Sequence, residues 1–224
     1  MDKSKKISLE VDAILFDMDG TLIDSSQACA RIWGRWAEYY GLNKDEVIHQ
    51  SHGRRPEDTA LSVLGENADI KAAVKLFSIE EAKEKDVTTI TGAKDLLINI
   101  PKDKWAIVTS STESIARERL SYCGLPIPTS LITAEKVAKG KPDPEGYLKA
   151  AEELNVDIKN CIVIEDAPGG IEAGHRAGAK VIVLATTYQP SKFPNEIVIY
   201  DLSAIHLSVT ENGKIKLSFV PITN

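Results

Sequence analysis

The chain has 224 residues, of which 43% are hydrophobic and 27% are charged, as in ordinary globular proteins of one large or two small domains. Its formal net charge of −6 provides no basic surface for nucleic acid or for an anionic membrane, so we expect neither partner. No apolar run approaches the length that a membrane-spanning helix needs.

The first predicted strand covers residues 11–16 (VDAILF) and ends abruptly at Asp17. It is short and apolar, as expected for a strand that is buried on both faces of a parallel sheet. The segment that follows, residues 23–89, has an almost entirely helical pattern and is long enough to hold a small core of its own. We therefore predict a helical cap domain at 23–89 and a discontinuous core domain at 1–22 and 90–224.

Three helical stretches are predicted within this insert. The first can be capped by Asp24 or Ser25, carries Trp33 and Trp36, and ends at Gly41. Aromatic residues at helical spacing belong more often to a core than to a ligand site, so we interpret the two tryptophans as core residues. The other two stretches are residues 58–64 and 69–85.

Beyond the insert, short apolar strands alternate with helices, which predicts a doubly wound, Rossmann-like α/β domain with a parallel sheet. The predicted strands are residues 105–109, 130–133, 161–164 and 180–185. The predicted helices are residues 91–100, TESIARERLSYCG, PEGYLKAAEELN and GGIEAGHRAG. Near the end of the chain, IVIYDLSAI predicts one more strand and HLSVTENGKIKLSF predicts a hairpin that turns at Asn212-Gly213.

Four of the predicted strand ends lead into clusters of polar side chains. Ligands of open α/β sheets bind beyond the carboxyl ends of the strands, so we expect these clusters to converge on one rim of the sheet. The clusters are Asp17-Met18-Asp19-Gly20-Thr21, Thr109-Ser110-Ser111-Thr112, Gly140-Lys141-Pro142-Asp143-Pro144 and Glu165-Asp166.

The acidic residues of this rim predict a magnesium site. Clustered carboxylates repel one another unless a cation neutralises them, and oxygen ligands beside a phosphate suit Mg²⁺. Asp17 and Asp19 are two positions apart, so both side chains project to the same side of an extended backbone. Lys141 would supply positive charge for phosphate oxygens, and Ser110 would supply a hydroxyl. These groups suit phosphoryl transfer in which one carboxylate attacks phosphorus and another exchanges a proton.

The same segments resemble the four motifs of the haloacid dehalogenase superfamily, in that family's order. They are DMDGTL, TSS, GKPDPEGY and IVIEDAPGGIEAG, and the helical insert lies where the family has its C1 cap. The resemblance implies that Asp17 is the nucleophile and a metal ligand, and that Asp19 is the acid/base with its backbone carbonyl on the metal. It also implies that Ser110, Ser111 and Lys141 bind the phosphate, and that Glu165 and Asp166 bind Mg²⁺.

Several residues have a structural alternative to a functional role. Glu165 could orient a neighbour rather than bind the metal, and Asp143 and Asp24 are more simply helix caps. His175 and His206 lie outside the rim clusters, and we interpret them as ordinary surface or packing residues.

The cap segment at residues 49–56 (HQSHGRRP) is predicted to recognise the leaving group of the substrate. It is polar, contains Gly and Pro, and separates two helical stretches, although a solvated loop would have the same composition. HxSHGxR and IxTAxxVxxGKPxPExYL resemble segments of fungal-type glycerol-phosphate and 2-deoxyglucose-6-phosphate phosphatases. We therefore predict that His52, Gly53 and Arg54 bind substrate, and that the substrate is a small polyol phosphate or hexose phosphate.

Three functions fit these residues. The favoured one is a Mg²⁺-dependent phosphatase that acts through an aspartyl-phosphate, and the alternative is a β-phosphoglucomutase-like enzyme with the same motifs. The third is a catalytically silent binding protein, against which the intact set of Asp17, Asp19, Lys141 and Asp166 argues. Asp19 also argues against a relationship to transport ATPases, which have a threonine at this position.

The cysteines and the N-terminus predict a cytoplasmic protein. The three cysteines, Cys29, Cys123 and Cys161, are far apart and form no CxxC pair, so neither disulfides nor structural zinc are expected. The N-terminal residues MDKSKKISLEVD are basic but have no apolar segment, so they do not predict a secretory signal. We expect a monomer, with the hairpin at 206–219 as the alternative edge for a dimer.

Overall fold

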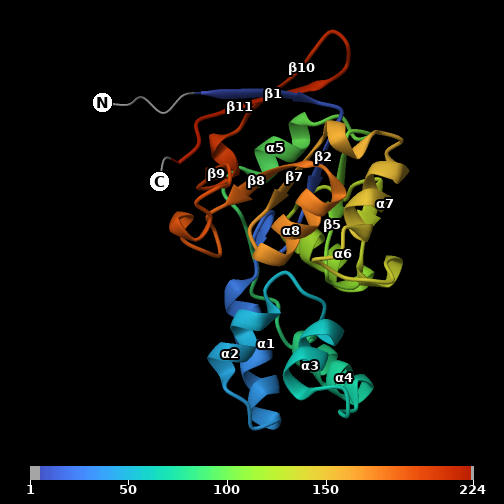
Figure 1. Cartoon of the computed structure of the whole chain (residues 1–224), viewed down its shortest axis with the longest axis vertical. Coiled ribbons are helices and arrows are strands. Elements are labelled where there is room, and N and C mark those ends of the chain that lie inside the picture. Colours follow the sequence, from blue (N-terminus) through green and yellow to red (C-terminus); the bar gives the residue numbers. More distant parts are fainter. Residues whose placement is uncertain (1–5, 223–224) are drawn as a thin grey trace.

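The structure is a computed structural model that describes residues 6–222 (Figure 1). The outer ends of the predicted core domain lie outside this range, as does part of the N-terminus that we examined for a secretory signal. Among the described residues, no helix combines the length and the apolar character that crossing a membrane requires.

A six-stranded parallel sheet forms the centre of the α/β core and confirms the predicted fold class. Its strands lie in the order β6 (Ser130–Ile132), β5 (Trp105–Val108), β2 (Ala13–Phe16), β7 (Cys161–Glu165), β8 (Lys180–Leu184) and β9 (Val198–Ile199). Because β2 lies between β5 and β7, the segments that follow these three strands emerge side by side. Three of the four predicted polar clusters follow these strands, and the fourth, at residues 140–144, lies in the segment after β6.

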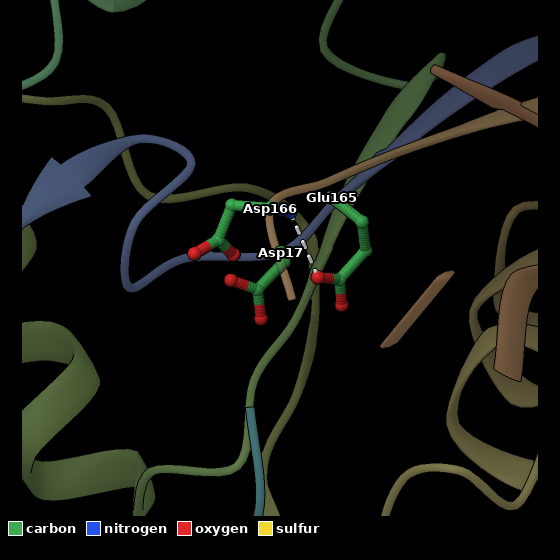
Figure 2. Close-up of side chains that lie close together, drawn as sticks. All are labelled: Asp17, Glu165 and Asp166. Carbon is green, nitrogen blue, oxygen red and sulfur yellow. Dashed lines mark hydrogen bonds between the residues drawn. The ribbon is translucent and has the colours of Figure 1, made fainter. Parts of the chain in front are cut away.

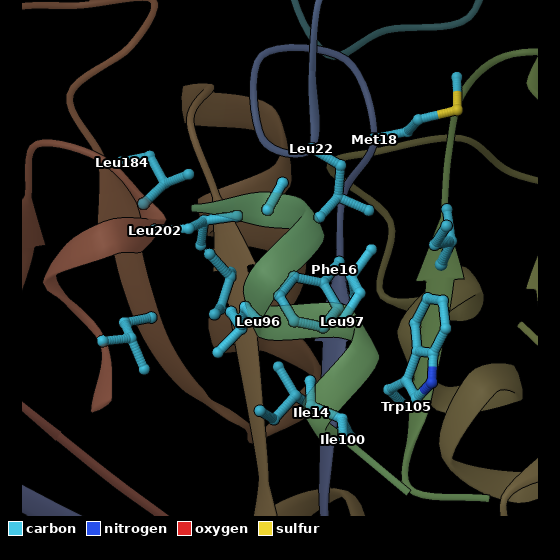
Figure 3. Close-up of a cluster of buried hydrophobic side chains, with 14 of the residues drawn as sticks. Ile14, Phe16, Met18, Leu22, Leu96, Leu97, Ile100, Trp105, Leu184 and Leu202 are labelled. Atoms are coloured by element: carbon cyan, nitrogen blue, oxygen red, sulfur yellow. The ribbon is translucent and has the colours of Figure 1, made fainter. Parts of the chain in front are cut away.

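Helices cover both faces of the sheet: α5 (Ala93–Asn99) and α6 (Glu113–Tyr122) one face, α7 (Glu145–Glu153) and α8 (Pro168–Ala177) the other. Alternate residues of β2 therefore enter different hydrophobic cores. Ile14 and Phe16 pack in the core that contains Leu97 of α5 (Figure 3), whereas Ala13 and Leu15 pack on the α7 and α8 side. Burial on both faces explains why the strands are apolar throughout.

The insert consists of four helices: α1 (Ser26–Tyr39), α2 (Lys44–Ser51), α3 (Pro56–Leu64) and α4 (Ile70–Glu81). They pack around a hydrophobic cluster of their own, in which the Trp33 and Phe77 ring centroids are 4.6 Å apart. Trp36 is fully buried there, and its indole Nε1 donates a hydrogen bond to the carbonyl of Ala73 (2.9 Å). Both tryptophans are therefore buried in the core of the insert, as predicted, and Trp33 also borders the cavity described below.

Two short strands, β3 (Ile23–Asp24) and β4 (Thr88–Thr89), pair antiparallel where the chain passes between the sheet and the helical insert. Figure 1 shows the insert as a separate group of helices below the sheet. We keep residues 23–89 as the proposed extent of the cap domain.

Helix α2 differs from the sequence prediction, which has a loop at residues 49–56. The helix continues to Ser51, and only residues 52–55 separate it from α3. The sequence pattern missed α2 because the helix buries only Val47 and Ser51 and so has little apolar periodicity. It begins at Lys44 because the Asn43 side chain accepts a hydrogen bond from the backbone N–H of Glu46 (3.1 Å).

A small antiparallel sheet lies at the other end of the core, with the order β1 (Ile7–Val11), β11 (Ile215–Phe219) and β10 (His206–Val209). The β10–β11 pair confirms the predicted hairpin. Strand β1 was not predicted, because its alternation is short and it is stabilised by pairing with a strand from the far end of the sequence. Short 3₁₀ helices occupy Ala134–Lys136, Ile158–Asn160, Pro190–Lys192 and Leu202–Ala204.

Candidate active site

Three buried carboxylates meet at the carboxyl ends of β2 and β7 (Figure 2). Asp17 directly follows β2, Glu165 is the last residue of β7, and Asp166 comes next. A carboxylate oxygen of each residue lies within 4.8 Å of one from each of the other two. The parallel pairing of β2 with β7 therefore brings together residues about 150 positions apart in the chain.

Lys141 is the cation of this cluster. Its Nζ donates hydrogen bonds to Asp17 Oδ1 (2.5 Å) and to Glu165 Oε1 (2.6 Å), and its side chain is only 5% exposed. The loop that carries it is held by Glu145, whose carboxylate accepts the backbone N–H groups of Ala138 and Lys139. Lys141 therefore lies behind Asp17 and fixes the orientation of this carboxylate.

Each carboxylate oxygen of Glu165 accepts two hydrogen bonds. Its Oε1 accepts from Lys141 and from the Tyr147 hydroxyl (2.8 Å), and its Oε2 accepts from the backbone N–H groups of Asp166 and Ala167. These contacts are those of a residue that orients its neighbours, one of the two roles that the sequence left open. They also explain how a carboxylate can be entirely buried.

The cluster carries excess negative charge, which burial makes unfavourable. Burial raises the pKa of Asp17 well above its usual value, and Glu165 and Asp166 add to this shift while Lys141 opposes it. Burial, with the neighbouring charge of Glu165, raises the pKa of Asp166 to about 7. With all three carboxyl groups ionised, the cluster and the Lys141 ammonium have two negative charges in excess, which one divalent cation would balance. Since all the donors are oxygens, the site fits a hard cation such as Mg²⁺.

The hydroxyl residues predicted to hold phosphate follow β5 and face the same region. Ser110 Oγ donates a hydrogen bond to the carbonyl of Gly53 (3.0 Å), and Ser111 Oγ donates to Asp19 Oδ2 (3.2 Å). Ser110 therefore contacts the loop between α2 and α3, whereas Ser111 contacts the predicted acid/base.

Asp19 forms an ion pair that the sequence analysis did not predict. Arg119 of α6 donates from Nη1 to Asp19 Oδ1 (2.8 Å) and from Nη2 to Glu81 Oε1 (3.2 Å). Arg119 is buried, whereas Tyr122, three residues further along α6, is 66% exposed. A signal was present, because Arg119 follows Ala116 by three residues and precedes Leu120, both of which are apolar and buried.

These residues surround a cavity of about 290 Å³ between the sheet rim and the helical insert. On the core side it is lined by Asp17, Asp19, Ser110, Ser111, Arg119 and Asp166, and on the insert side by Trp33, His52, Gly53, Arg54, Phe77 and Glu81. Eight of the ten predicted site residues therefore line one cavity, and the other two, Lys141 and Glu165, lie behind Asp17.

The loop at residues 52–55 closes one side of the cavity. His52 Nδ1 lies 2.8 Å from the Tyr188 hydroxyl, which belongs to the segment after β8, and burial lowers the pKa of this histidine. Arg54 donates from Nη2 to the carbonyl of Asp58, and its buried Nε–H has no hydrogen-bond partner among the described residues. The loop therefore presents polar groups to whatever occupies the cavity.

The remaining residues of interest lie away from the cavity or act as caps. The Asp143 carboxylate accepts the backbone N–H of Glu145, the first residue of α7 (3.1 Å), although the N-cap position itself is occupied by Pro144. Asp24 lines the cavity wall, but its carboxylate also accepts the backbone N–H of Ser26 at the start of α1. His175 and His206 are exposed, as predicted.

The sequence matches known proteins over most of its length. The family model of the haloacid dehalogenase-like hydrolases covers residues 14–184. The chain is 37% identical to hexitol phosphatase A of Escherichia coli, over 90% of this chain and 96% of that protein. It is also 37% identical to glycerol-1-phosphate phosphohydrolase 1 of Saccharomyces cerevisiae, over 83% of this chain and 79% of that protein.

Solved structures share the fold. A hydrolase from Pseudomonas syringae superposes with a TM-score of 0.77 at 24% identity, covering 85% of this chain and 93% of that one. The family match and the two relatives agree with the motif resemblance seen in the sequence. The chain therefore belongs to the haloacid dehalogenase-like hydrolases and is a phosphatase of that family.

Proposed function

We propose that the chain is a Mg²⁺-dependent phosphomonoesterase that hydrolyses small sugar or polyol phosphates through an aspartyl-phosphate on Asp17. The observation that carries this proposal is the buried cluster of Asp17, Glu165, Asp166 and Lys141, of which Asp17 and Asp166 line the cavity below the helical insert. Such a cluster, with net negative charge, favours a divalent cation, and the cavity gives a phosphate ester access to Asp17.

The metal ligands would be the carboxylates of Asp17 and Asp166 and the backbone carbonyl of Asp19, with Glu165 as a direct ligand or as the residue that orients them. Bound there, Mg²⁺ would neutralise charge on the phosphoryl oxygens. Lys141 would hold the Asp17 carboxylate in place, and its charge would also attract the phosphoryl group.

The reaction would proceed in two displacements. In the first, an Asp17 carboxylate oxygen attacks phosphorus, the bond to the leaving alcohol breaks, and Asp19 donates a proton to the alcohol oxygen. In the second, Asp19 takes a proton from a water molecule that attacks phosphorus, which releases phosphate and regenerates the Asp17 carboxylate. Ser110 and Ser111 would bind phosphoryl oxygens from the end of β5.

The leaving group is proposed to be a polyol or sugar. The relatives are named for hexitol and for glycerol 1-phosphate, and the cavity of about 290 Å³ is near the lower limit for small-metabolite sites. His52, Gly53 and Arg54 would contact the hydroxyl groups, and Trp33 and Phe77 would contact carbon atoms of the leaving group. The β-phosphoglucomutase alternative is not favoured, since both relatives are named as phosphatases.

Phosphate release from a panel of hexitol, hexose, 2-deoxyglucose and glycerol phosphates tests the proposal. We expect release in the presence of Mg²⁺, none with EDTA, and a loss of at least about 1,000-fold in Asp17→Asn, because the nucleophile is removed. Asp103→Asn, at an exposed aspartate before β5, is the matched control and should behave as the wild type. Metal-independent release, or an active Asp17→Asn protein, would contradict the mechanism.

A cytoplasmic location and a monomeric state stay part of the proposal. Sedimentation of the full chain tests the second, and a stable dimer would contradict it.

A further inference from the structure

Arg119 occupies an unusual position for an arginine. It lies on the buried face of α6, only 7% exposed, and lines the catalytic cavity beside the proposed acid/base. A buried guanidinium is unfavourable unless it is paired, and Arg119 has two carboxylate partners from different parts of the chain. Asp19 comes from the sheet rim, and Glu81 is the last residue of α4 in the helical insert.

Both oxygens of the Asp19 carboxylate accept a hydrogen bond in the free protein, and Arg119 is the partner that remains when Ser111 turns to a phosphoryl oxygen as proposed above. Arg119 Nη1 binds Oδ1 at 2.8 Å, and Ser111 Oγ binds Oδ2 at 3.2 Å. The Asp19 side chain is nevertheless 24% exposed, so without the guanidinium it could rotate within the cavity and approach the other carboxylates. A proton donor must keep a fixed distance and direction to the leaving oxygen, because small displacements lower the rate steeply.

Glu81 completes the arrangement. Its side chain is 10% exposed and accepts a hydrogen bond from Nη2 of the same guanidinium, so Arg119 keeps a second hydrogen-bond partner when Asp19 has taken up a proton. Because Glu81 belongs to the insert, the pair also ties Asp19 to the position of α4. Arg117 and Glu113 form an ordinary ion pair on the exposed side of α6. Such a pair neither holds Asp19 nor connects the core to the insert.

We infer that Arg119 is a positioning residue for the reaction proposed above, on which this inference rests: it holds the Asp19 carboxylate in the orientation from which it donates its proton to the leaving alcohol, with Glu81 as the second partner of the guanidinium. In this role Arg119 acts through Asp19 and not directly on the reacting atoms. In the first displacement, this role matters when a poor leaving group must be protonated.

The test compares two leaving groups. An alkyl phosphate needs a proton on its leaving oxygen, whereas p-nitrophenolate leaves without one, and kcat/KM reports only the steps up to cleavage of the phosphate ester. For Arg119→Gln we expect kcat/KM to fall by about 100-fold with the alkyl phosphate that the wild type hydrolyses best, and by no more than about threefold with p-nitrophenyl phosphate. Arg119→Lys keeps the charge without the two-pronged geometry, so its alkyl phosphate activity should be intermediate.

Arg117→Gln, at an exposed arginine of the same helix, is the matched control and should leave both values unchanged. If kcat/KM falls equally with the two substrates in Arg119→Gln, Arg119 has a merely structural role and the inference is overturned. If Arg119→Gln does not fold, the same comparison is made with Arg119→Lys. Unchanged activity with the alkyl phosphate would overturn the inference as well. A wild-type protein that hydrolyses neither ester would instead overturn the proposed function, so the two failures are distinguishable.

Discussion

Gly20 shows how a single backbone position shapes the site. It follows Asp19 with a φ of +87°, in the left-handed region that side chains rarely adopt. A Cβ at this position would lie 2.1 Å from Asp166 Oδ2 and 2.9 Å from Thr187 Oγ1. Both the conformation and the space therefore demand glycine, and the turn can pass close to the proposed metal ligand.

For Gly20→Ala we expect activity to fall by about 100-fold and the affinity for Mg²⁺ to weaken, because Asp166 must move. Gly41→Ala is the matched control, since Gly41 has a φ of +65° but no atom within 4 Å of the added Cβ. Both variants should lose about 1 kcal/mol of stability from backbone strain. Enzyme assays and melting curves measure the two effects, and equal activity in the two variants would contradict the clash.

Glu81 gives a stability prediction with a defined sign. Burial raises its pKa from 4.5 to about 7, although the charge of Arg119 opposes the shift. A carboxyl whose pKa is raised on folding contributes stability below its unfolded pKa and loses this contribution as the pH rises through the folded value. The free energy of unfolding should therefore fall between about pH 4.5 and pH 7, by up to about 3 kcal/mol from this group.

Glu81→Gln removes this titration and retains the volume of the side chain. Urea unfolding without metal, at pH 5 and at pH 8, should show a smaller loss of stability in Glu81→Gln than in the wild type. The contributions of Asp17 and Asp166 are common to both proteins, so the difference isolates Glu81. An identical pH dependence in the two proteins would show that Glu81 is ionised throughout this range.

At the scale of the elements, α2 and α4 begin with equivalent side-chain caps but end at different places. Asn43 caps α2 through Glu46 N–H, and Asp69 caps α4 through Ala72 N–H (3.0 Å). Helix α2 leads into the cavity loop at residues 52–55, whereas the N-terminus of α4 does not line the cavity.

Asn43→Ala and Asp69→Ala should each lower the free energy of unfolding by about 1 kcal/mol, because each helix loses its cap. Only Asn43→Ala should also raise KM, since α2 supports His52 and Gly53 in the cavity wall. Chemical denaturation and steady-state kinetics with one alkyl phosphate check both effects. A KM that rises equally in both variants would show that the loop does not depend on α2.

The elements also show what the sequence could and could not predict. The parallel strands could be predicted because each is buried on both faces. Since the carboxyl ends of parallel strands meet at one edge of the sheet, the strand ends also predicted that the three carboxylates lie together. Helix α2 lacked the apolar periodicity on which prediction depends. The contact between Arg119 and Glu81 could not be predicted from the sequence, because it depends on how α4 and α6 approach one another in space. Periodicity marks which residues are buried but not which partners they meet.

For the whole molecule, the excess negative charge of the site links stability to metal. Binding of Mg²⁺ only to the folded state should raise the free energy of unfolding by about 2.7 kcal/mol at a concentration 100-fold above Kd. Melting temperatures with Mg²⁺ and with EDTA should therefore differ by several degrees in the wild type. In Asp166→Asn the difference should nearly vanish. Equal melting temperatures of the wild type in both conditions would argue against a metal at this cluster.

The hydrogen bond from Ser110 to the carbonyl of Gly53 has a consequence for the order of events during turnover. The hydroxyl has a single proton to donate, so if Ser110 binds phosphate as proposed, a phosphoryl oxygen and the cap loop would compete for that proton. Phosphate binding would thus detach the loop at one point, and departure of phosphate would let it reattach. Saturating inorganic phosphate should then speed amide hydrogen exchange in residues 52–55 while slowing it around the cluster. The free enzyme would hold the loop in place, and inorganic phosphate, the product of the reaction, would release it.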